Sequence, residues 1–378
     1  MRIGILTLPL NTNYGGILQA YSLQTVLERM GHEVVVFQND YDGIRRYPVY
    51  KMFLIMGKRF LRNCIKGKTI PVFMEWKRKR ELPIVTQYTQ SFIDNHIHTY
   101  HVNSFDDIHS VDFDVIVVGS DQIWRRDYFR RIWKSEMPNA YLKFMSSASI
   151  KRIAYAVSFG KDTWDYSEKE TEICRMLAKE FNAISVREDT AVNLCLKYLS
   201  VNAEHVLDPT MLLSRQDYID LIQNAKVPNN SGSLFAYVLD KTSSKMSLIN
   251  QIAEDRRMKP YFIDYLSLDF SKPIEQRIVP PVETWLRSFY DAEFVVTDSF
   301  HGCVFSIIFG KPFVALGNPD RGMSRFISLL KTFGLDDHLV MSVKDYNPKK
   351  SYGLSNDLNK HFTSLQDQSR SFLIHALQ

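Results

Sequence analysis

The 378-residue sequence is poor in cysteine and contains no long apolar run. Its four cysteines, Cys64, Cys174, Cys195 and Cys303, are scattered without CxxC spacing, which argues against a disulfide framework and against a zinc site. No run of about 18 apolar residues occurs, so a membrane-spanning helix is not expected. The apolar start, Met1–Leu8, has only the length of a strand, so a signal peptide is not expected either. These absences indicate a cytoplasmic protein.

The composition is that of a globular chain with an uneven charge. Hydrophobic residues make up 45% and charged residues 24%, which excludes a disordered or a fibrous protein. The 47 Lys and Arg residues exceed the 42 Asp and Glu residues by five. Between Gly43 and Arg80, however, twelve Lys and Arg residues face the single acid Glu75. The excess positive charge is therefore concentrated in one segment.

Apolar runs of strand length alternate with amphipathic stretches of helix length, a pattern typical of parallel α/β units. We expect an α/β fold of two Rossmann-like, doubly wound domains. Turn-forming residues at 226–232 divide an N-terminal domain, 1–228, from a C-terminal domain, 229–345. Residues 346–378 are expected to form a helix that packs back toward the N-terminal domain. Two such domains facing each other leave a cleft at the carboxyl ends of their strands.

The basic segment is expected to be a helical insertion in the first domain, at about 43–110. Phe53, Phe60 and Leu61 alternate there with Lys58 and Arg62, so one face would be apolar and the other cationic. Such a helix can pack its apolar face on its own domain, or it can lie on an anionic membrane surface. Nucleic-acid binding is not expected, because no recognition motif accompanies the charge.

His301 is the most informative single residue. It follows the apolar run 293–297 and directly precedes Gly302, which opens an apolar helix. A side chain at such a position projects into the crevice above the sheet, and the free amides around Ser299 and Gly302 would attract an anion. An imidazole there can transfer a proton near neutral pH. The alternative is a histidine that only caps the helix.

Arg187 occupies the equivalent place in the first domain, directly after the expected strand 183–186. A guanidinium at the carboxyl end of a strand suits two-point recognition of a phosphate or a carboxylate. The alternative is a surface ion pair with Glu188 or Asp189. Arg321 and Arg325 follow a later strand, where they would add positive potential to the cleft or remain solvated.

Two loops of the first domain are candidate ligand-binding segments. Paired glycines after the first strand allow close backbone approach to a ligand, although the loop lacks the GxGxxG pattern of dinucleotide binding. The alternative for this first loop is a tight turn without a ligand. The second loop offers a carboxylate and an amide for sugar hydroxyls, and its alternative is an Asp that caps a helix. The candidate residues are Asn13, Tyr14, Gly15 and Gly16 in the first loop and Ser120, Asp121 and Gln122 in the second.

Two further groups of residues are weaker candidates. Asp208-Pro209-Thr210 ends the last strand of the first domain and is more typical of a turn fixed by proline. The histidines His96 and His98 lie close together with His101, but they have no Cys or acidic partner nearby in the sequence, so no metal site is expected.

Several motifs together resemble the polysaccharide pyruvyl transferase family, in family order from about residue 3 to residue 335. The motifs are Asn13-Tyr14-Gly15-Gly16 with Leu18-Gln19-Ala20-Tyr21, Gly119-Ser120-Asp121-Gln122-Ile123-Trp124, Tyr155-Ala156-Val157-Ser158-Phe159-Gly160, Ser185-Val186-Arg187-Glu188, Asp208-Pro209-Thr210 and Thr297-Asp298-Ser299-Phe300-His301-Gly302. Each motif alone is weak, but the ordered set is specific.

The resemblance implies a GT-B-like fold and the transfer of pyruvate from phosphoenolpyruvate to two hydroxyls of a sugar, as a cyclic ketal. The acceptor would belong to a cell-surface polysaccharide or its lipid-linked precursor, and no cofactor is implied. His301 would be the general acid, Arg187 would bind the anionic groups, and Asp121 would orient the acceptor or act as a base. Ser299 stands where many members carry an arginine, so Arg321 or Arg325 would have to replace that cation, or the donor differs.

Two other functions compete with this reading. A GT-B glycosyltransferase that uses a nucleotide sugar would have the same two facing domains, since a fold does not determine a function. A non-catalytic sugar-binding or assembly protein is the third hypothesis.

Overall fold

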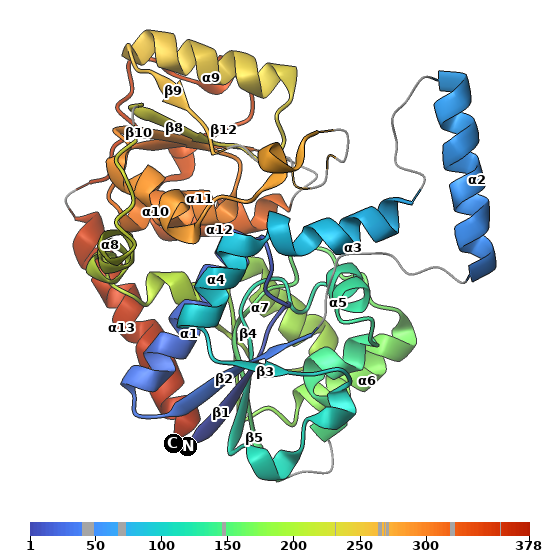
Figure 1. Cartoon of the computed structure of the whole chain (residues 1–378). Helices are drawn as coiled ribbons and strands as arrows, with labels where there is room; N and C mark the ends of the chain where they lie inside the picture. The colour runs from blue at the N-terminus through green and yellow to red at the C-terminus, as the bar shows by residue number, and fades with distance from the viewer. Residues whose placement is uncertain are drawn as a thin grey trace.

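The computed structural model describes residues 1–39, 49–66, 73–145, 149–230, 232–263, 267, 269, 272–317, 322–355 and 357–378. The polypeptide forms two lobes, each built on a parallel β-sheet (Figure 1). The expected α/β fold of two doubly wound units is confirmed.

The first lobe contains a seven-stranded parallel sheet in the order β3-β2-β1-β4-β5-β6-β7. Every residue of β4 is buried, because helices cover both faces of the sheet. The strand order reverses between β1 and β4, and the crevice of a doubly wound sheet lies at such a point. The strands are β1 (Arg2–Leu6), β2 (Glu33–Gln38), β3 (Thr99–His101), β4 (Val115–Gly119), β5 (Lys151–Val157), β6 (Ala183–Val186) and β7 (Glu204–His205).

The second lobe contains a five-stranded parallel sheet in the order β12-β11-β10-β8-β9. Its strand order reverses between β8 and β10, which are both fully buried. The strands are β8 (Leu234–Tyr237), β9 (Pro260–Tyr261), β10 (Phe294–Thr297), β11 (Phe313–Leu316) and β12 (Leu339–Val340).

Helices connect the strands of both sheets. Those of the first lobe include α1 (Tyr14–Arg29), α5 (Arg126–Ile132), α6 (Glu168–Ala178) and α7 (Asp189–Leu194). Those of the second lobe include α9 (Ser243–Arg256), α10 (Val282–Asp291), α11 (Phe300–Ile308) and α12 (Met323–Thr332). None of the described helices is both long enough and apolar enough to cross a membrane.

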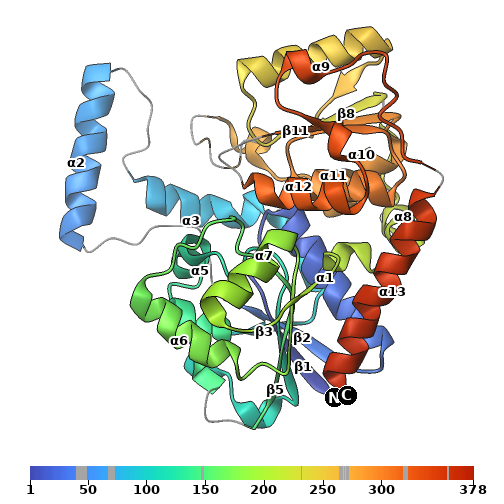
Figure 2. The same cartoon turned by 180° about the vertical axis from the view of Figure 1, so that it is seen from behind.

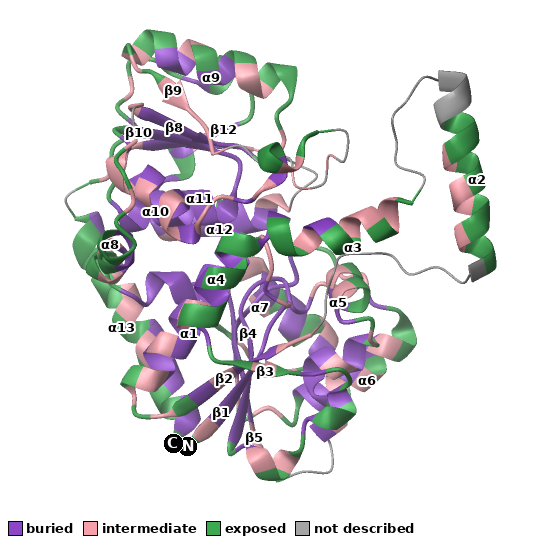
Figure 3. Ribbon diagram, viewed as in Figure 1, coloured by how far each residue is buried: buried purple, intermediate pink, exposed green. Residues whose placement is uncertain are grey.

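The expected basic helical insertion is confirmed between β2 and β3. It comprises α2 (Val49–Lys66), α3 (Met74–Val85) and α4 (Gln87–His96); the flanking residues 40–48 and 67–72 lie outside the described part of the chain. Helix α4 packs on the body beside α1, whereas α2 stands away from both lobes (Figures 1 and 2). The outward side of α2 is exposed (Figure 3).

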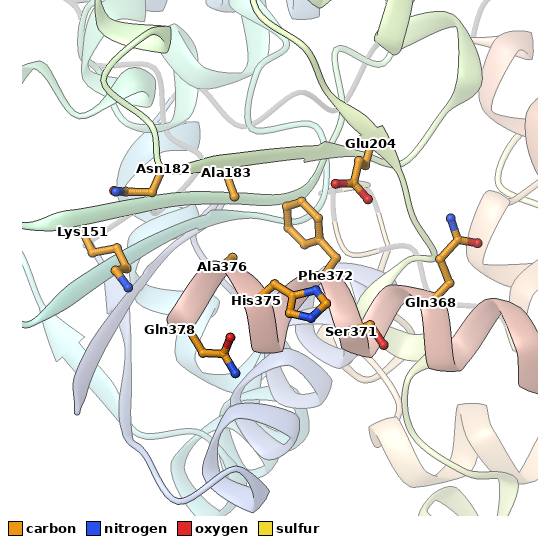
Figure 4. A pocket seen from close by; sticks show the side chains of 10 residues that line it. All are labelled: Lys151, Asn182, Ala183, Glu204, Gln368, Ser371, Phe372, His375, Ala376 and Gln378. Carbon is orange, nitrogen blue, oxygen red and sulfur yellow. The ribbon is translucent and has the colours of Figure 1, made fainter.

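Helices α8 and α13 connect the lobes. Tyr218 of α8 (Arg215–Asn224) packs on Phe305 of the second lobe, with 4.9 Å between the ring centroids. The hydroxyl of Tyr218 is hydrogen-bonded to the hydroxyl of Ser22 in the first lobe, at 2.9 Å. The last helix, α13 (Leu358–Leu377), runs back along the first lobe to end near the N-terminus (Figure 2). Its Phe372 points toward the strand that carries Ala183, beside a hollow at this edge of the sheet (Figure 4).

Candidate active site

A pocket of about 300 Å³ lies between the lobes, where the switch points of the two sheets face each other. Its walls come from the loops after β1, β4, β8 and β10 and from the start of α12. The lining residues are Thr12, Asn13, Gly15, Asp121, Gln122, Arg125, Tyr128, Tyr237, Leu239, Asp298, Ser299, Phe300, His301, Arg325 and Phe326. The loops that follow the switch-point strands in both lobes therefore converge on one pocket.

His301 enters this pocket from the second residue of α11. The Oγ of Ser299, at the N-cap of the helix, accepts a hydrogen bond from the amide of Gly302 at 3.4 Å, which orients the first turn. The imidazole of His301 lies so close to Gly15 of the first lobe that a β-carbon on Gly15 would overlap the ring. The missing side chain of Gly15 thus allows the histidine of one lobe to reach the other.

Asp208, which follows β7, connects His301 with Arg187. Its Oδ2 accepts a hydrogen bond from Nη1 of Arg187 at 2.7 Å and lies 3.7 Å from Nε2 of His301. Its Oδ1 accepts hydrogen bonds from the amide and the hydroxyl of Thr210. Burial alone would raise the pKa of Asp208, but His301, Arg187 and Thr210 together hold it well below its usual range. Asp208 is therefore a buried carboxylate, not a neutral acid.

Arg187 lies behind the pocket wall, with only 1% of its side chain exposed. Its guanidinium carbon is 4.6 Å from the ring centroid of Phe300, and its Nη2 is 3.6 Å from Oδ1 of Asp121. Burial would lower its pKa, but the carboxylates of Asp208, Asp121 and Glu188 raise it. Nε and Nη2 have no hydrogen-bond partner in the described part of the chain. Because buried donors without a partner are rare in proteins, these two atoms are candidates for contact with a ligand.

Two more arginines line the pocket itself. Burial, together with the nearby charge of Arg187, lowers the pKa of Arg325 to about 10, so Arg325 stays protonated at neutral pH. Nη1 of Arg125 donates a hydrogen bond to the side-chain oxygen of Gln122 at 2.8 Å, and its guanidinium lies 4.0 Å from the ring centroid of Tyr128. One imidazole and two guanidiniums therefore line the pocket beside the carboxylates of Asp121 and Asp298, and the guanidinium of Arg187 lies behind its wall. Guanidiniums so placed suit a small anion.

The structure brings most of the predicted site residues together. Asn13, Gly15, Asp121, Gln122, Ser299, His301 and Arg325 line the pocket, and Arg187 lies directly behind it. Arg321 lies outside the described residues.

The other four predicted binding residues do not line the pocket. Tyr14 is fully buried, donates a hydrogen bond to the carbonyl of Pro280 at 2.8 Å and stacks on Trp285, with ring centroids 5.4 Å apart. The hydroxyl of Ser120 donates to the carbonyl of Ala156 at 2.8 Å. Gly16 lies against the side chain of Asn13, and Gly302 lies against that of Thr297. Tyr14 and Ser120 are thus held by hydrogen bonds to backbone carbonyls, and Gly16 and Gly302 allow close packing in the first turns of α1 and α11.

Asp208 is more than the turn residue that its sequence context indicated, and Arg125 and Tyr128 were not among the predicted site residues. The sequence did place Asp208 at the carboxyl end of a strand, where ligand-binding residues lie in such folds. The proline that follows it favoured a turn instead. Arg125 directly follows the motif 119–124, so a place beside Asp121 could have been predicted from the sequence. In the described part of the chain, no group of three His, Cys, Asp or Glu side chains could hold a metal ion.

Comparison with known proteins identifies the family. The sequence matches the family described as polysaccharide pyruvyl transferase over residues 13–321, which is well over half of the chain. The chain belongs to the polysaccharide pyruvyl transferase family. The resemblance inferred from the ordered motifs is thus confirmed. No curated protein matches the sequence.

Solved structures confirm the fold. The UDP-GlcNAc 2-epimerase from Methanocaldococcus jannaschii is similar with a TM-score of 0.54 and 13% identity, over 100% of each chain. The UDP-GlcNAc 2-epimerase from Neisseria meningitidis, bound to UDP-GlcNAc, is similar with a TM-score of 0.50 and 10% identity, over 100% of this chain and 99% of that one. At such low identity the likeness shows the GT-B-like arrangement of the two lobes and nothing about the substrate.

Proposed function

We propose that this member of the family transfers pyruvate from phosphoenolpyruvate to two hydroxyls of a sugar and forms a cyclic ketal. The observation that carries the proposal is the meeting of His301 with Arg125 and Arg325 at one pocket of about 300 Å³, with Arg187 directly behind its wall. Phosphoenolpyruvate is a small molecule with a carboxylate and a phosphate, which guanidiniums bind well. A pocket of this size suits that donor better than a nucleotide sugar.

His301 acts as the general acid in the first step. It gives a proton to the methylene carbon of phosphoenolpyruvate, which makes C2 electrophilic, and a sugar hydroxyl adds to C2 while Asp121 orients that hydroxyl or takes its proton. Asp208 acts as a positioning residue, because its carboxylate compensates the positive charge of a protonated imidazole 3.7 Å away.

The arginines act in the second step. The bond between C2 and the phosphate oxygen breaks, the second sugar hydroxyl bonds to C2, and its proton leaves with the phosphate. Arg125 and Arg325 at the wall, with the two unused donors of Arg187 behind it, stabilise the charge that develops on the departing phosphate.

A second, larger hollow provides room for the acceptor. It has a volume of about 1080 Å³, lies at the carboxyl ends of β8, β11 and β12, and shares Tyr128 with the smaller pocket. Its lining includes the polar side chains of Asp240 and Thr242 and the apolar side chains of Leu248 and Met341. Carboxylates and hydroxyls bind sugar hydroxyls, and apolar surfaces pack on sugar rings, so a glycan, including a lipid-linked one, fits this hollow.

The test is incubation of the protein with phosphoenolpyruvate and candidate lipid-linked glycans. We expect release of inorganic phosphate with a matching gain of one pyruvate ketal in the mass of the glycan. His301→Ala should lower turnover by about 10² to 10⁴, the usual contribution of a general acid. Full turnover by this variant would contradict the assignment of His301.

Ligand-induced thermal stabilisation distinguishes the donor from that of the glycosyltransferase alternative. Millimolar phosphoenolpyruvate should raise the melting temperature of the protein, because a ligand that binds only the folded state stabilises it. Stabilisation by nucleoside diphosphates, with none by phosphoenolpyruvate, would instead support a nucleotide-sugar donor.

A further inference from the structure

The outward side of α2 carries a continuous apolar face. Tyr50, Phe53, Leu54, Phe60 and Leu61 are each between 57% and 64% exposed. Phe53, Leu54, Phe60 and Leu61 are three, four, ten and eleven residues along from Tyr50, which places all five on one face of an α-helix. An exposed apolar face of this extent on a soluble domain marks an interaction surface.

A row of cations flanks this face. Lys51, Lys58 and Arg62 are all exposed, and their spacing of seven and four residues places them on one line beside the apolar residues. Helix α2 contains no Asp or Glu at all. Its exposed surface is therefore apolar on one side and purely positive on the other.

The inward side of α2 is tied to α3. Arg59 donates two hydrogen bonds to the carboxylate of Glu75, at 2.7 and 2.8 Å, and both side chains are mostly buried. The hydrogen bonds from Arg59 lower the pKa of Glu75. Arg59 lies on the helix face opposite Phe53 and Leu61, so this ion pair keeps the apolar face turned outward. Trp76, the residue after Glu75, adds an aromatic side chain that is 75% exposed.

We infer that α2 is an interfacial helix that holds the protein on an anionic lipid bilayer. Its apolar residues enter the boundary between headgroups and acyl chains, while Lys51, Lys58 and Arg62 contact anionic headgroups. The charge argues against a second copy of this chain as the partner, because pairing two α2 helices would bring their rows of like charges together.

The position of α2 agrees with a bilayer-held acceptor. Helix α2 lies on the same side of the molecule as α5, which carries Tyr128 of the acceptor hollow (Figures 1 and 2). This link to a lipid-linked acceptor rests on the proposed function. Docking of α2 to a bilayer does not, since it needs only the exposed surface of the helix.

The experiment is sedimentation of the full-length protein with vesicles. One set contains phosphatidylcholine alone, and the other contains equal parts of phosphatidylcholine and phosphatidylglycerol. We expect binding to the anionic vesicles that weakens as salt is added. The variant with Lys51→Gln, Lys58→Gln and Arg62→Gln should bind about a hundredfold more weakly, since each cation near an anionic surface contributes about 1 kcal/mol. The variant with Phe53→Glu and Leu61→Glu should lose binding.

Matched controls use exposed residues elsewhere. Leu196→Glu replaces an apolar side chain that is 59% exposed, and the variant with Lys169→Gln, Lys197→Gln and Lys360→Gln removes the same charge from other surfaces. Both controls should bind anionic vesicles like the original protein. The inference is overturned if the protein does not bind anionic vesicles, if the controls lose binding equally, or if Phe53→Glu with Leu61→Glu only dissociates an oligomer in size-exclusion chromatography.

Turnover with a water-soluble acceptor separates this inference from the proposed function. The α2 variants should release phosphate from phosphoenolpyruvate at the original rate, because α2 contributes no residue to the pocket. Vesicle binding without any phosphate release would leave this inference intact and contradict the proposed function. Phosphate release without vesicle binding would contradict this inference and leave the proposed function intact.

Discussion

Gly15 determines how closely His301 of the second lobe can approach the first lobe. A β-carbon at Gly15 would overlap the imidazole ring. Gly15→Ala should therefore displace His301 and lower kcat about a hundredfold, the effect of a misplacement of about 1 Å, while the overpacking costs about 1 to 3 kcal/mol of stability. Steady-state kinetics and urea unfolding measure the two effects. Gly57→Ala, where a β-carbon would meet no atom within 4 Å, is the control and should retain full activity.

Asp208 should make the stability of the protein depend on pH in the acidic range. Its pKa in the folded protein is lowered, below the value of about 3.9 for an unfolded chain. The unfolded state therefore binds a proton first as the pH falls, so the stabilisation by Asp208 is present above pH of about 4 and is lost below it.

The variant Asp208→Asn tests this dependence. At neutral pH it should lower the free energy of unfolding by about 3 to 5 kcal/mol, because it leaves Arg187 buried without its closest ion-pair partner. Urea unfolding of both proteins at a series of pH values should show the difference between them shrinking below pH of about 4. A difference that stays constant with pH would contradict the ionised state assigned to Asp208.

Sequence patterns place single residues along the chain but not across it. The place of His301 was predictable, because a strand, a short loop and an apolar helix follow one another in the sequence, although the helix begins at Phe300 and not, as expected, at Gly302. The role of Asp208 was not predictable, because its partners Arg187 and His301 lie 21 and 93 positions away in the sequence. Tyr14 resembled a ligand-loop residue, yet packing between the lobes buries it against Trp285.

At the scale of elements, α13 connects the end of the chain to the first lobe. Leu373 is fully buried in the core that also contains Ile5 of β1, whereas the next residue, Ile374, is 45% exposed. Leu373→Ala should lower the free energy of unfolding by about 2 to 5 kcal/mol through the cavity it leaves. Ile374→Ala should change it by about 0.5 kcal/mol or less. Equal effects in urea unfolding would contradict the packing of α13.

Strands and helices were predictable where burial has one simple cause. The continuous apolar run of β4 reads as a strand covered on both faces, and the structure buries all five residues. The apolar face of α2 was predictable as well, but the sequence does not tell whether this face points toward the protein or toward solvent. The spacing of the apolar residues is the same in both cases. The ion pair of Arg59 with Glu75 joins the opposite face of α2 to α3, and it thereby turns the apolar face outward.

At the scale of the whole molecule, two lobes facing a cleft followed from the alternation of strands and helices, but how tightly the lobes pack together did not. One core cluster contains Ile5 of the first sheet, Val295 of the second sheet and Leu373 of α13. The two other clusters are each confined to a single lobe. Unfolding of either lobe alone would therefore expose apolar surface of the other.

This shared core should make the protein unfold as one cooperative unit, although multidomain chains of this length commonly do not. Differential scanning calorimetry should show one transition, with a calorimetric enthalpy equal to the van't Hoff enthalpy. Because the pocket is built from both lobes, bound phosphoenolpyruvate should move the whole transition to higher temperature without splitting it. Two resolved transitions, only one of which responds to the ligand, would show that the lobes are stable separately and that the cluster joining them contributes little.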